Sequence, residues 1–92
     1  ATPLLSQNYP NPFNPETTIS FQMPKAAPVR LAIYNVKGQL VKVLHDGTAS
    51  QGDNSVVWDG TDAGGNAVSS GIYFSRLESG SKTEIRKMML MK

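Results

Sequence analysis

The chain has 92 residues, 39% of them hydrophobic and 17% charged, which is the composition of one globular domain rather than of a disordered chain. It has no cysteine, one histidine and no apolar run long enough to cross a bilayer, so a disulfide framework, a zinc site and a transmembrane segment are all excluded. The net charge is +2, and residues 82–92 alone carry four cations against one anion, a net +3, so the basic character belongs to the C-terminal end.

The first 16 residues are rich in proline and asparagine. Each proline fixes φ, removes a backbone donor and disfavours helix at the residue before it, so we expect an extended or turn-rich arm. Tyr9 and Phe13 would be costly to leave in water. We therefore predict that residues 1–16 pack on a domain formed by residues 17–92. The chain begins Ala1-Thr2-Pro3 without an initiator methionine, and we expect it to be a segment of a longer protein.

An apolar–polar alternation with a period of two begins at Thr17 and predicts strands. The expected strands cover residues 17–23, 29–33, 40–44, 56–58, 71–79 and 83–91, with a further short strand at 67–68. Glycine- and asparagine-rich turns separate them about every ten residues, and residues 61–66 are expected to form a loop. This pattern predicts an all-β fold, an immunoglobulin-like antiparallel β-sandwich of about seven strands.

The loop after the fourth expected strand contains Asp59, Asp62 and Asn66. Ca²⁺ takes six to eight oxygen ligands, and such a loop could supply some of them. The spacing does not match an EF-hand, however, and Asp, Asn and Gly are also the residues that tight turns prefer. Turn formation is the favoured interpretation, calcium binding is the weaker alternative, and no cofactor is predicted.

Three aromatic residues and one glycine are predicted to be structural. Trp58 could stack on a sugar, but as the bulkiest residue of an alternating strand it is expected in the core. Tyr73 follows Gly71 at the start of a strand and is expected to act as a tyrosine corner, with its hydroxyl bonded to the backbone. Phe13 is expected to anchor the arm.

No set of residues predicts catalysis. A catalytic triad would have to use His45, with Ser50, Asp46 or Asp53 nearby in sequence, but no Gly-x-Ser-x-Gly motif is present. There is no phosphate-binding loop or dinucleotide fingerprint. The basic C-terminal residues lack interleaved exposed aromatics, which argues against nucleic acid as a partner. We expect a protein that is not an enzyme.

The last expected strand has two compatible interpretations. Its cations could simply discourage edge-to-edge pairing. Alternatively, an export machinery could recognise the strand by β-addition, with backbone bonds giving affinity and alternate side chains giving selectivity. Methionine suits adaptable contacts as well as a core. The candidate recognition residues are Lys87, Met88, Met89, Leu90, Met91 and Lys92.

Several strings, in this order and spacing, resemble one family. They are the Pro/Asn-rich string at residues 5–15, Thr18-Ile19-Ser20-Phe21, Ile33-Tyr34-Asn35, Gly38-Gln39, Trp58-Asp59-Gly60, Ser70-Gly71-Ile72-Tyr73, Lys87-Met88 and the terminal Lys92. Together they resemble the C-terminal sorting domain of type IX (Por) secretion, and the middle strings are similar to the immunoglobulin-like domain of the flagellar hook-capping protein. The arm and the lysine-terminated end favour the sorting domain.

The resemblance implies a secretion module at the C-terminus of a larger protein. Its expected partners are the outer-membrane secretion machinery, a sortase-like peptidase and an N-terminal cargo domain, and its expected location is secreted or at the cell surface, reached through the periplasm of a Gram-negative bacterium. The alternative is a carbohydrate-binding or purely structural accessory domain of a secreted hydrolase. The identity of the cargo, cleavage after export and the oligomeric state stay open.

Overall fold

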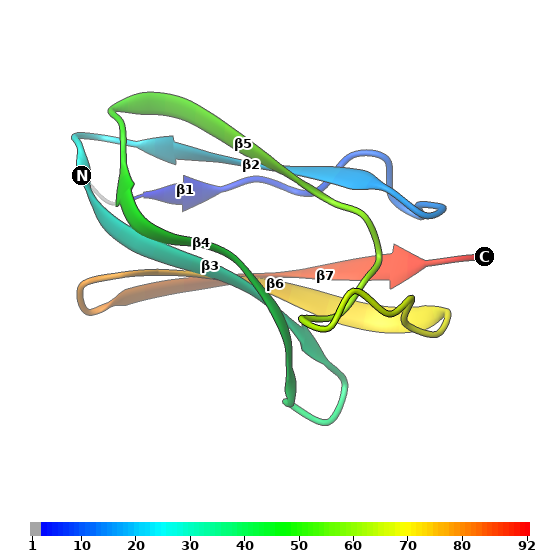
Figure 1. Ribbon diagram of the computed structural model, residues 1–92. Coiled ribbons are helices and arrows are strands. Elements are labelled where there is room, and N and C mark those ends of the chain that lie inside the picture. Colours follow the sequence, from blue (N-terminus) through cyan, green and yellow to red (C-terminus); the bar gives the residue numbers. More distant parts are fainter. Residues whose placement is uncertain (1–2) are drawn as a thin grey trace.

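The computed structural model describes residues 3–92, and β-strands are the regular elements of this part of the chain. They are β1 (Leu4–Leu5), β2 (Thr17–Met23), β3 (Ala27–Asn35), β4 (Leu40–Ala49), β5 (Gly52–Trp58), β6 (Gly71–Ser79) and β7 (Lys82–Leu90). Figure 1 shows them in two layers, with the C-terminus beyond the tip of β7. The expected all-β antiparallel sandwich of about seven strands is confirmed.

The two sheets are antiparallel throughout. One has the strand order β1-β2-β5 and the other the order β4-β3-β6-β7, so β7 is an edge strand of the larger sheet and β1 an edge strand of the smaller. These two edges meet on one side of the sandwich: the backbone N–H of Leu5 donates to Glu84 Oε1 (3.1 Å), and Arg86 Nε donates to the Leu5 carbonyl (3.1 Å). This pair of bonds closes the sandwich beside the terminal strand.

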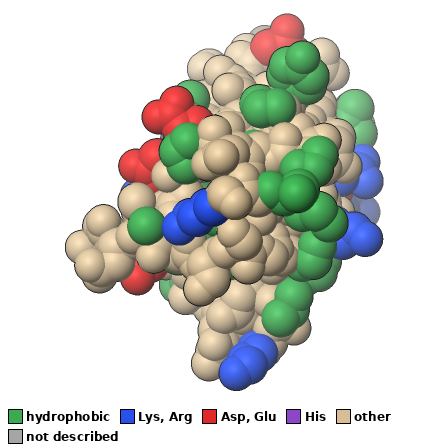
Figure 2. Space-filling view, turned by 90° about the vertical axis from the view of Figure 1, so that its right-hand side faces the viewer, with side chains coloured by type: hydrophobic (Ala, Val, Ile, Leu, Met, Phe, Trp, Pro, Cys, Tyr) green, Lys and Arg blue, Asp and Glu red, His purple; other side chains and the backbone are tan. Residues whose placement is uncertain are grey.

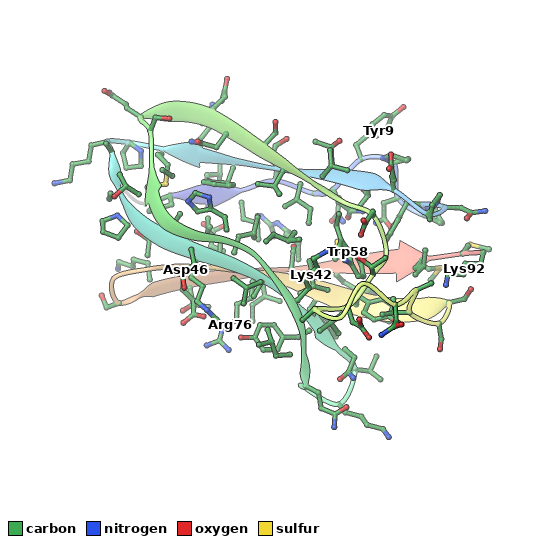
Figure 3. All side chains as sticks on the ribbon, in the orientation of Figure 1. Tyr9, Lys42, Asp46, Trp58, Arg76 and Lys92 are labelled. Carbon is green, nitrogen blue, oxygen red and sulfur yellow. The ribbon has the colours of Figure 1, made fainter. Side chains whose placement is uncertain are left out.

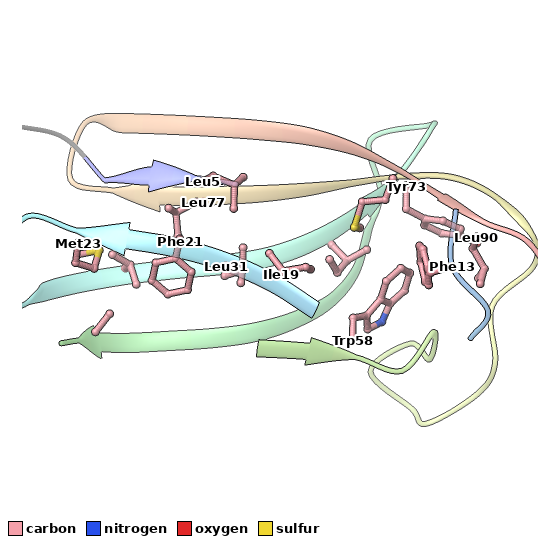
Figure 4. Close-up of a cluster of buried hydrophobic side chains, with 14 residues drawn as sticks. Leu5, Phe13, Ile19, Phe21, Met23, Leu31, Trp58, Tyr73, Leu77 and Leu90 are labelled. Carbon is pink, nitrogen blue, oxygen red and sulfur yellow. The ribbon is translucent and has the colours of Figure 1, made fainter. Parts of the chain in front are cut away.

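The core lies between the sheets and follows from the alternation of the strands. The inward residues Leu31, Ile33 and Leu77 are almost completely buried. Toward the end that holds the C-terminus, the Trp58 ring packs between Phe13 at 5.6 Å and Tyr73 at 5.3 Å, as the close-up in Figure 4 shows. Aromatic pairs at such distances and tilts stabilise a core beyond their buried area. An arm residue thus contributes directly to the core.

Several strand boundaries differ from the sequence prediction, and strand pairing accounts for three of the differences. The third expected strand was placed at 40–44, but β4 continues to Ala49 because its pairing with β3 passes through Gly47, opposite Val29. The strand predicted from residue 56 begins at Gly52, since the polar residues of β5 pair with β2. The expected strand at 67–68 is absent, and a single bridge between Thr61 and Ala67 replaces it.

Candidate functional site

The terminal strand divides the recognition candidates between two faces. Met88 and Leu90 point into the core and are 0% and 1% exposed. Lys87 and Met89 alternate with them and are exposed, as are Met91 and Lys92 beyond the strand. The structure therefore brings together as a surface only the candidates that alternate outward, and it assigns the other two to packing.

The backbone edge of β7 is covered by the N-terminal arm. Phe13 lies parallel to the strand: its N–H donates to the Met89 carbonyl (3.0 Å), and its carbonyl accepts from the Met91 N–H (2.9 Å). The Asn11 side chain accepts from the Met89 N–H (3.0 Å), and Gln7 Nε2 donates to the Lys87 carbonyl (2.8 Å). The expectation that this edge is available for β-addition is wrong over residues 87–91, because the arm already makes the bonds that a partner strand would make.

The arm is held by one buried aromatic ring and one buried amide. Phe13 is 2% exposed, and Asn8, also 2% exposed, donates from Nδ2 to the Pro10 carbonyl (3.1 Å) and to Thr17 Oγ1 (2.9 Å). Tyr9 is different: its backbone pairs with Thr18 in both directions, but its ring is 81% exposed. The expectation that the Tyr9 ring packs on the domain is wrong, because the bonds that fix this residue are backbone bonds. Figure 3 shows the ring projecting from the molecule.

The terminal lysine lies against the segment that leads into β6. The backbone N–H of Lys92 donates to Ser70 Oγ (3.0 Å), and its ammonium group donates to the Val68 carbonyl. Gly71 follows with φ at +149°, a conformation that side chains with a Cβ rarely adopt, which explains glycine there. The C-terminus and the start of β6 are therefore joined.

Tyr73 lies just inside this junction. Its hydroxyl donates to the Ser69 carbonyl (2.7 Å), four residues upstream, which is the geometry of a tyrosine corner. The side chain is 7% exposed, and this burial raises the pKa of Tyr73 above its usual value. The hydroxyl fixes the segment before β6 to the core.

The loop considered for calcium uses its oxygens to close its own turns. Asp62 Oδ1 accepts from the backbone N–H groups of Gly64 (2.9 Å) and Asn66 (3.0 Å). Asp59 Oδ1 accepts from the Thr61 hydroxyl (2.5 Å), and this bond, with Lys42 at 3.8 Å, lowers the pKa of Asp59. Within residues 3–92, no three His, Cys, Asp or Glu side chains are grouped so as to hold a metal ion.

His45, the residue any triad would need, is part of a strand. Its Nε2 lies 3.2 Å from the Gly47 carbonyl, and its ring lies 6.5 Å from the ring of Phe21. The imidazole is thus engaged by a backbone carbonyl of its own strand rather than by Ser50 or Asp53. No hydrogen bond joins His45 to Ser50 or Asp53, so the structure does not form this catalytic triad.

Trp58, the aromatic residue that could have stacked on a sugar, is inside the sandwich. Trp58 is 0% exposed, and its Nε1 donates to the Thr61 carbonyl (2.9 Å). Figure 3 places Trp58 between the sheets, whereas Arg76 points away from the core on the outer side of the larger sheet. This outer side holds the feature that the sequence analysis missed.

A hollow of about 320 Å³ lies on the outer face of the four-stranded sheet. Cross-strand neighbours form its floor: Tyr34 pairs with Phe74, and Arg76 pairs with Ile85. Its lining is Tyr34, Asn35, Val36, Gly38, Phe74, Arg76 and Ile85. The available sequence signal was that the outward positions of the last two strands include large apolar residues where polar ones are usual.

The surface near the terminal strand also carries apolar groups at the end of the molecule. Figure 2 looks at that end and shows hydrophobic side chains in a broken band with Lys and Arg side chains at its flank. In the part of the chain that the structure covers, no helix is long and apolar enough to cross a membrane.

Comparison with known proteins gives a family and several solved structures of similar fold. The family model described as FlgD Ig-like domain matches residues 6–82. No curated protein matches the chain significantly.

Among solved structures, the chain is similar to PorZ, which is described as an essential bacterial surface component of the type-IX secretion system of Porphyromonas gingivalis. The two share 23% sequence identity and superpose with a TM-score of 0.64. The match covers 92% of this chain and 11% of PorZ. It is also similar to dimeric latent PorU from the same species, with 22% identity and a TM-score of 0.76 over 99% of this chain and 10% of that one. The third relative is FlgD from P. aeruginosa, with 26% identity and a TM-score of 0.60 over 80% of this chain and 59% of that one. These matches bear out the immunoglobulin-like fold, and the chain corresponds to only a small part of the two Porphyromonas proteins.

Proposed function

The chain belongs to the FlgD Ig-like domain family, and from this premise we propose that it is a non-catalytic sorting module that directs a larger protein across the outer membrane by type IX secretion. In this proposal the cargo precedes the arm, and the outer-membrane secretion machinery is the partner. A sortase-like peptidase acts on the exported protein, which ends secreted or attached to the cell surface.

Two kinds of similarity support the proposal. The fold is like that of a module in PorZ, a protein described as a surface component of type IX secretion. The Pro/Asn-rich arm and the methionine-rich, lysine-terminated end are the strings that resemble sorting domains rather than the flagellar relatives. Immunoglobulin-like sandwiches serve many functions, so the proposal depends on the terminal strand more than on the fold.

The observation that carries the proposal is the outward row at the end of the chain. Lys87, Met89 and Met91 are exposed in alternation with buried neighbours, and Lys92 follows them. Polarisable methionines suit adaptable protein contacts, and the lysine charges can select a partner of opposite charge. The buried members of the same segment keep it straight and ordered, so the exposed ones are presented in a fixed array.

The experiment that tests this separates recognition from folding. The 92-residue chain is fused to the C-terminus of a reporter that carries a periplasmic export signal, in a bacterium with a type IX system. Lys87→Glu combined with Lys92→Glu changes exposed cations without touching Met88 or Leu90, whose deletion would damage the core. We expect this double variant to leave the reporter in the periplasm while the domain stays protease-resistant.

The matched control is Lys25→Glu combined with Lys82→Glu. Both residues are exposed, and the net charge changes by the same amount, but neither belongs to the candidate recognition residues 87–92: Lys25 lies between β2 and β3, and Lys82 is the first residue of β7. We expect the control to be exported like the wild type. Equal export of both double variants would contradict the proposal.

The alternative of a carbohydrate-binding accessory domain has less support in the geometry. It requires an exposed strip of aromatics, but Trp58 is 0% exposed and Tyr73 is 7% exposed. The face of the Tyr34 ring is covered by the Arg76 guanidinium, 5.6 Å from the ring centroid. Affinity electrophoresis in polysaccharide gels would reveal such a function as a retarded band.

A further inference from the structure

The outer face of the larger sheet continues the exposed row of β7 across two more strands. Side chains at alternate positions point away from the core, so Ile85 and Lys87 lie in register with Arg76 and Phe74 of β6. Phe74 in turn pairs with Tyr34 of β3. The hollow of about 320 Å³ is therefore bordered on its β7 side by Ile85, which lies two positions before Lys87 and points to the same side of the strand.

The hollow combines apolar walls with positive charge. Ile85 is 54% exposed and Val36 is 67% exposed, although both are large aliphatic residues. Lys87 and Lys37 are exposed beside them in sequence, and Arg76 forms part of the lining. Among the lining residues, Tyr34, Phe74 and Arg76 are of the types enriched where proteins bind one another.

The guanidinium of Arg76 lacks some of the hydrogen-bond and ion-pair partners that it could bind. Its Nε is buried but has no hydrogen-bond partner among residues 3–92, and Glu78 Oε1 is 3.6 Å away. The same Glu78 oxygen is shared with Arg30, at 3.4 Å. One carboxylate thus serves two guanidinium groups. Because the Arg76 Nε is buried while the side chain as a whole is 39% exposed, a second carboxylate would bind through the terminal nitrogens of Arg76.

The lining selects against a sugar and for a peptide side chain. Arg76 covers one face of the Tyr34 ring, so that face is not available for a sugar to stack on. Val36 and Ile85 are aliphatic walls that fit an aliphatic or aromatic side chain. A partner that fits both the walls and the charge carries an apolar residue flanked by carboxylates.

We propose that this hollow is a docking site for an acidic, apolar segment of a partner protein, with the apolar side chain between Val36, Phe74 and Ile85 and a carboxylate at Arg76. In the cell this inference rests on the proposed function, since the partner would belong to the secretion machinery. The arm covers the backbone edge of β7 over residues 87–91, so the contact uses side chains of the face.

The test is a titration of the isotope-labelled 92-residue chain with three short peptides, followed by two-dimensional NMR. The peptides are acetyl-Gly-Glu-Phe-Glu-Gly-amide and its counterparts with both Glu residues replaced by Gln or by Lys. We expect the acidic peptide to shift the amides of Tyr34, Phe74, Arg76 and Ile85, and to bind about fivefold more tightly than the Gln peptide.

Two pairs of variants separate the charge contact from the apolar one. Arg76→Gln should abolish the preference for the acidic peptide, whereas Arg30→Gln, which also loses an ion pair with Glu78, should keep it. Ile85→Ser should weaken the acidic and Gln peptides equally. Val57→Ser should weaken neither, although Val57 is 55% exposed, like Ile85, because it lies on the other sheet.

Three outcomes would overturn the inference. They are equal affinity for all three peptides, shifts confined to the outer face of the other sheet, and self-association of the free chain through Ile85, which would assign the hollow to a second copy. Because the titration needs no export, a negative result here leaves the reporter experiment unaffected. Loss of export in that experiment with no peptide binding here would separate the two proposals.

Discussion

The edge and the outer face of β7 belong to the same strand, but the edge is covered by the arm and the face is exposed to solvent. Along the edge, the arm bonds the Lys87 carbonyl, both backbone groups of Met89 and the Met91 N–H. On the face, the side chains of Ile85, Lys87 and Met89 are exposed. An edge covered in this way offers few backbone groups to another strand, and backbone bonds would not select among partners because they are the same for every sequence. Selectivity is therefore left to the side chains.

The arm should be held less firmly on the edge of β7 if the Phe13 side chain is removed. Phe13→Ala deletes a ring that is 2% exposed and packs on Trp58, so we expect a loss of about 3–5 kcal/mol in the free energy of unfolding. The loss follows from the lost burial and from the cavity left beside Trp58. Urea denaturation followed by tryptophan fluorescence measures it.

Tyr9→Ala is the matched control in the same arm. Its ring is 81% exposed and its backbone bonds to Thr18 survive the change, so we expect an effect of less than about 0.5 kcal/mol. Equal destabilisation by the two substitutions would show that the arm acts through its backbone rather than through Phe13.

A second way to break the cover is to push the end of the arm away. Gly60 has φ at +78°, and an added Cβ would lie 3.0 Å from the Pro15 carbonyl oxygen. We expect Gly60→Ala to cost about 1–2 kcal/mol for the backbone conformation and about 1 kcal/mol or more for the close contact. Thermal and urea denaturation give the total.

Gly65→Ala separates the two contributions. Gly65 has nearly the same φ, +83°, but an added Cβ would meet nothing within 4 Å. We expect it to cost only the conformational part, about 1–2 kcal/mol. If both variants lose the same stability, Pro15 does not constrain Gly60.

The face of each strand could be predicted from the sequence, but the cover of the edge could not. Alternation placed Leu31 and Ile33 inside because side-chain direction depends only on neighbouring residues. The bond between Asn11 and Met89 joins residues 78 positions apart, and no local pattern specifies it. The recognition candidates were correspondingly predicted as one string, and the structure divides them.

The same reasoning explains why the hollow was missed. Tyr34, Arg76 and Ile85 lie on three different strands and become neighbours only through the lateral order β3-β6-β7. That order is not contained in the periodicity of any one strand, although the resemblance to sorting domains implied the fold that has it. The loop of Asp59 and Asp62 was predictable, because turn residues act within a few positions.

A smaller change tests the cover of the β7 edge at one backbone amide, the N–H of Met89. Asn11→Ala removes the acceptor of the Met89 N–H while the Phe13 bonds remain. We expect a loss of about 0.5–1.5 kcal/mol, and faster hydrogen exchange at Met89 than at Met91. Asn14→Ala, at another exposed arm position, is the control and should leave both exchange rates unchanged. Unchanged exchange at Met89 in the Asn11 variant would contradict the role of this side chain in the cover.

The last expected effect lies under the covered end of β7, where Tyr73 pairs with Met88, and it depends on pH. Burial raises the pKa of Tyr73, so the folded protein favours the neutral phenol and its bond to the Ser69 carbonyl. The unfolded chain ionises near pH 10, at about the ordinary tyrosine value. The stability from this group is therefore complete below pH 10 and is lost as the pH rises from there through the folded pKa. Tyr73→Phe should be less stable than the wild type at pH 7 by about 0.5–1.5 kcal/mol, and the difference should shrink in urea titrations above pH 10. A difference that stays constant with pH would show that the hydroxyl reaches water, and that the arm seals the edge of β7 but not the core beneath it.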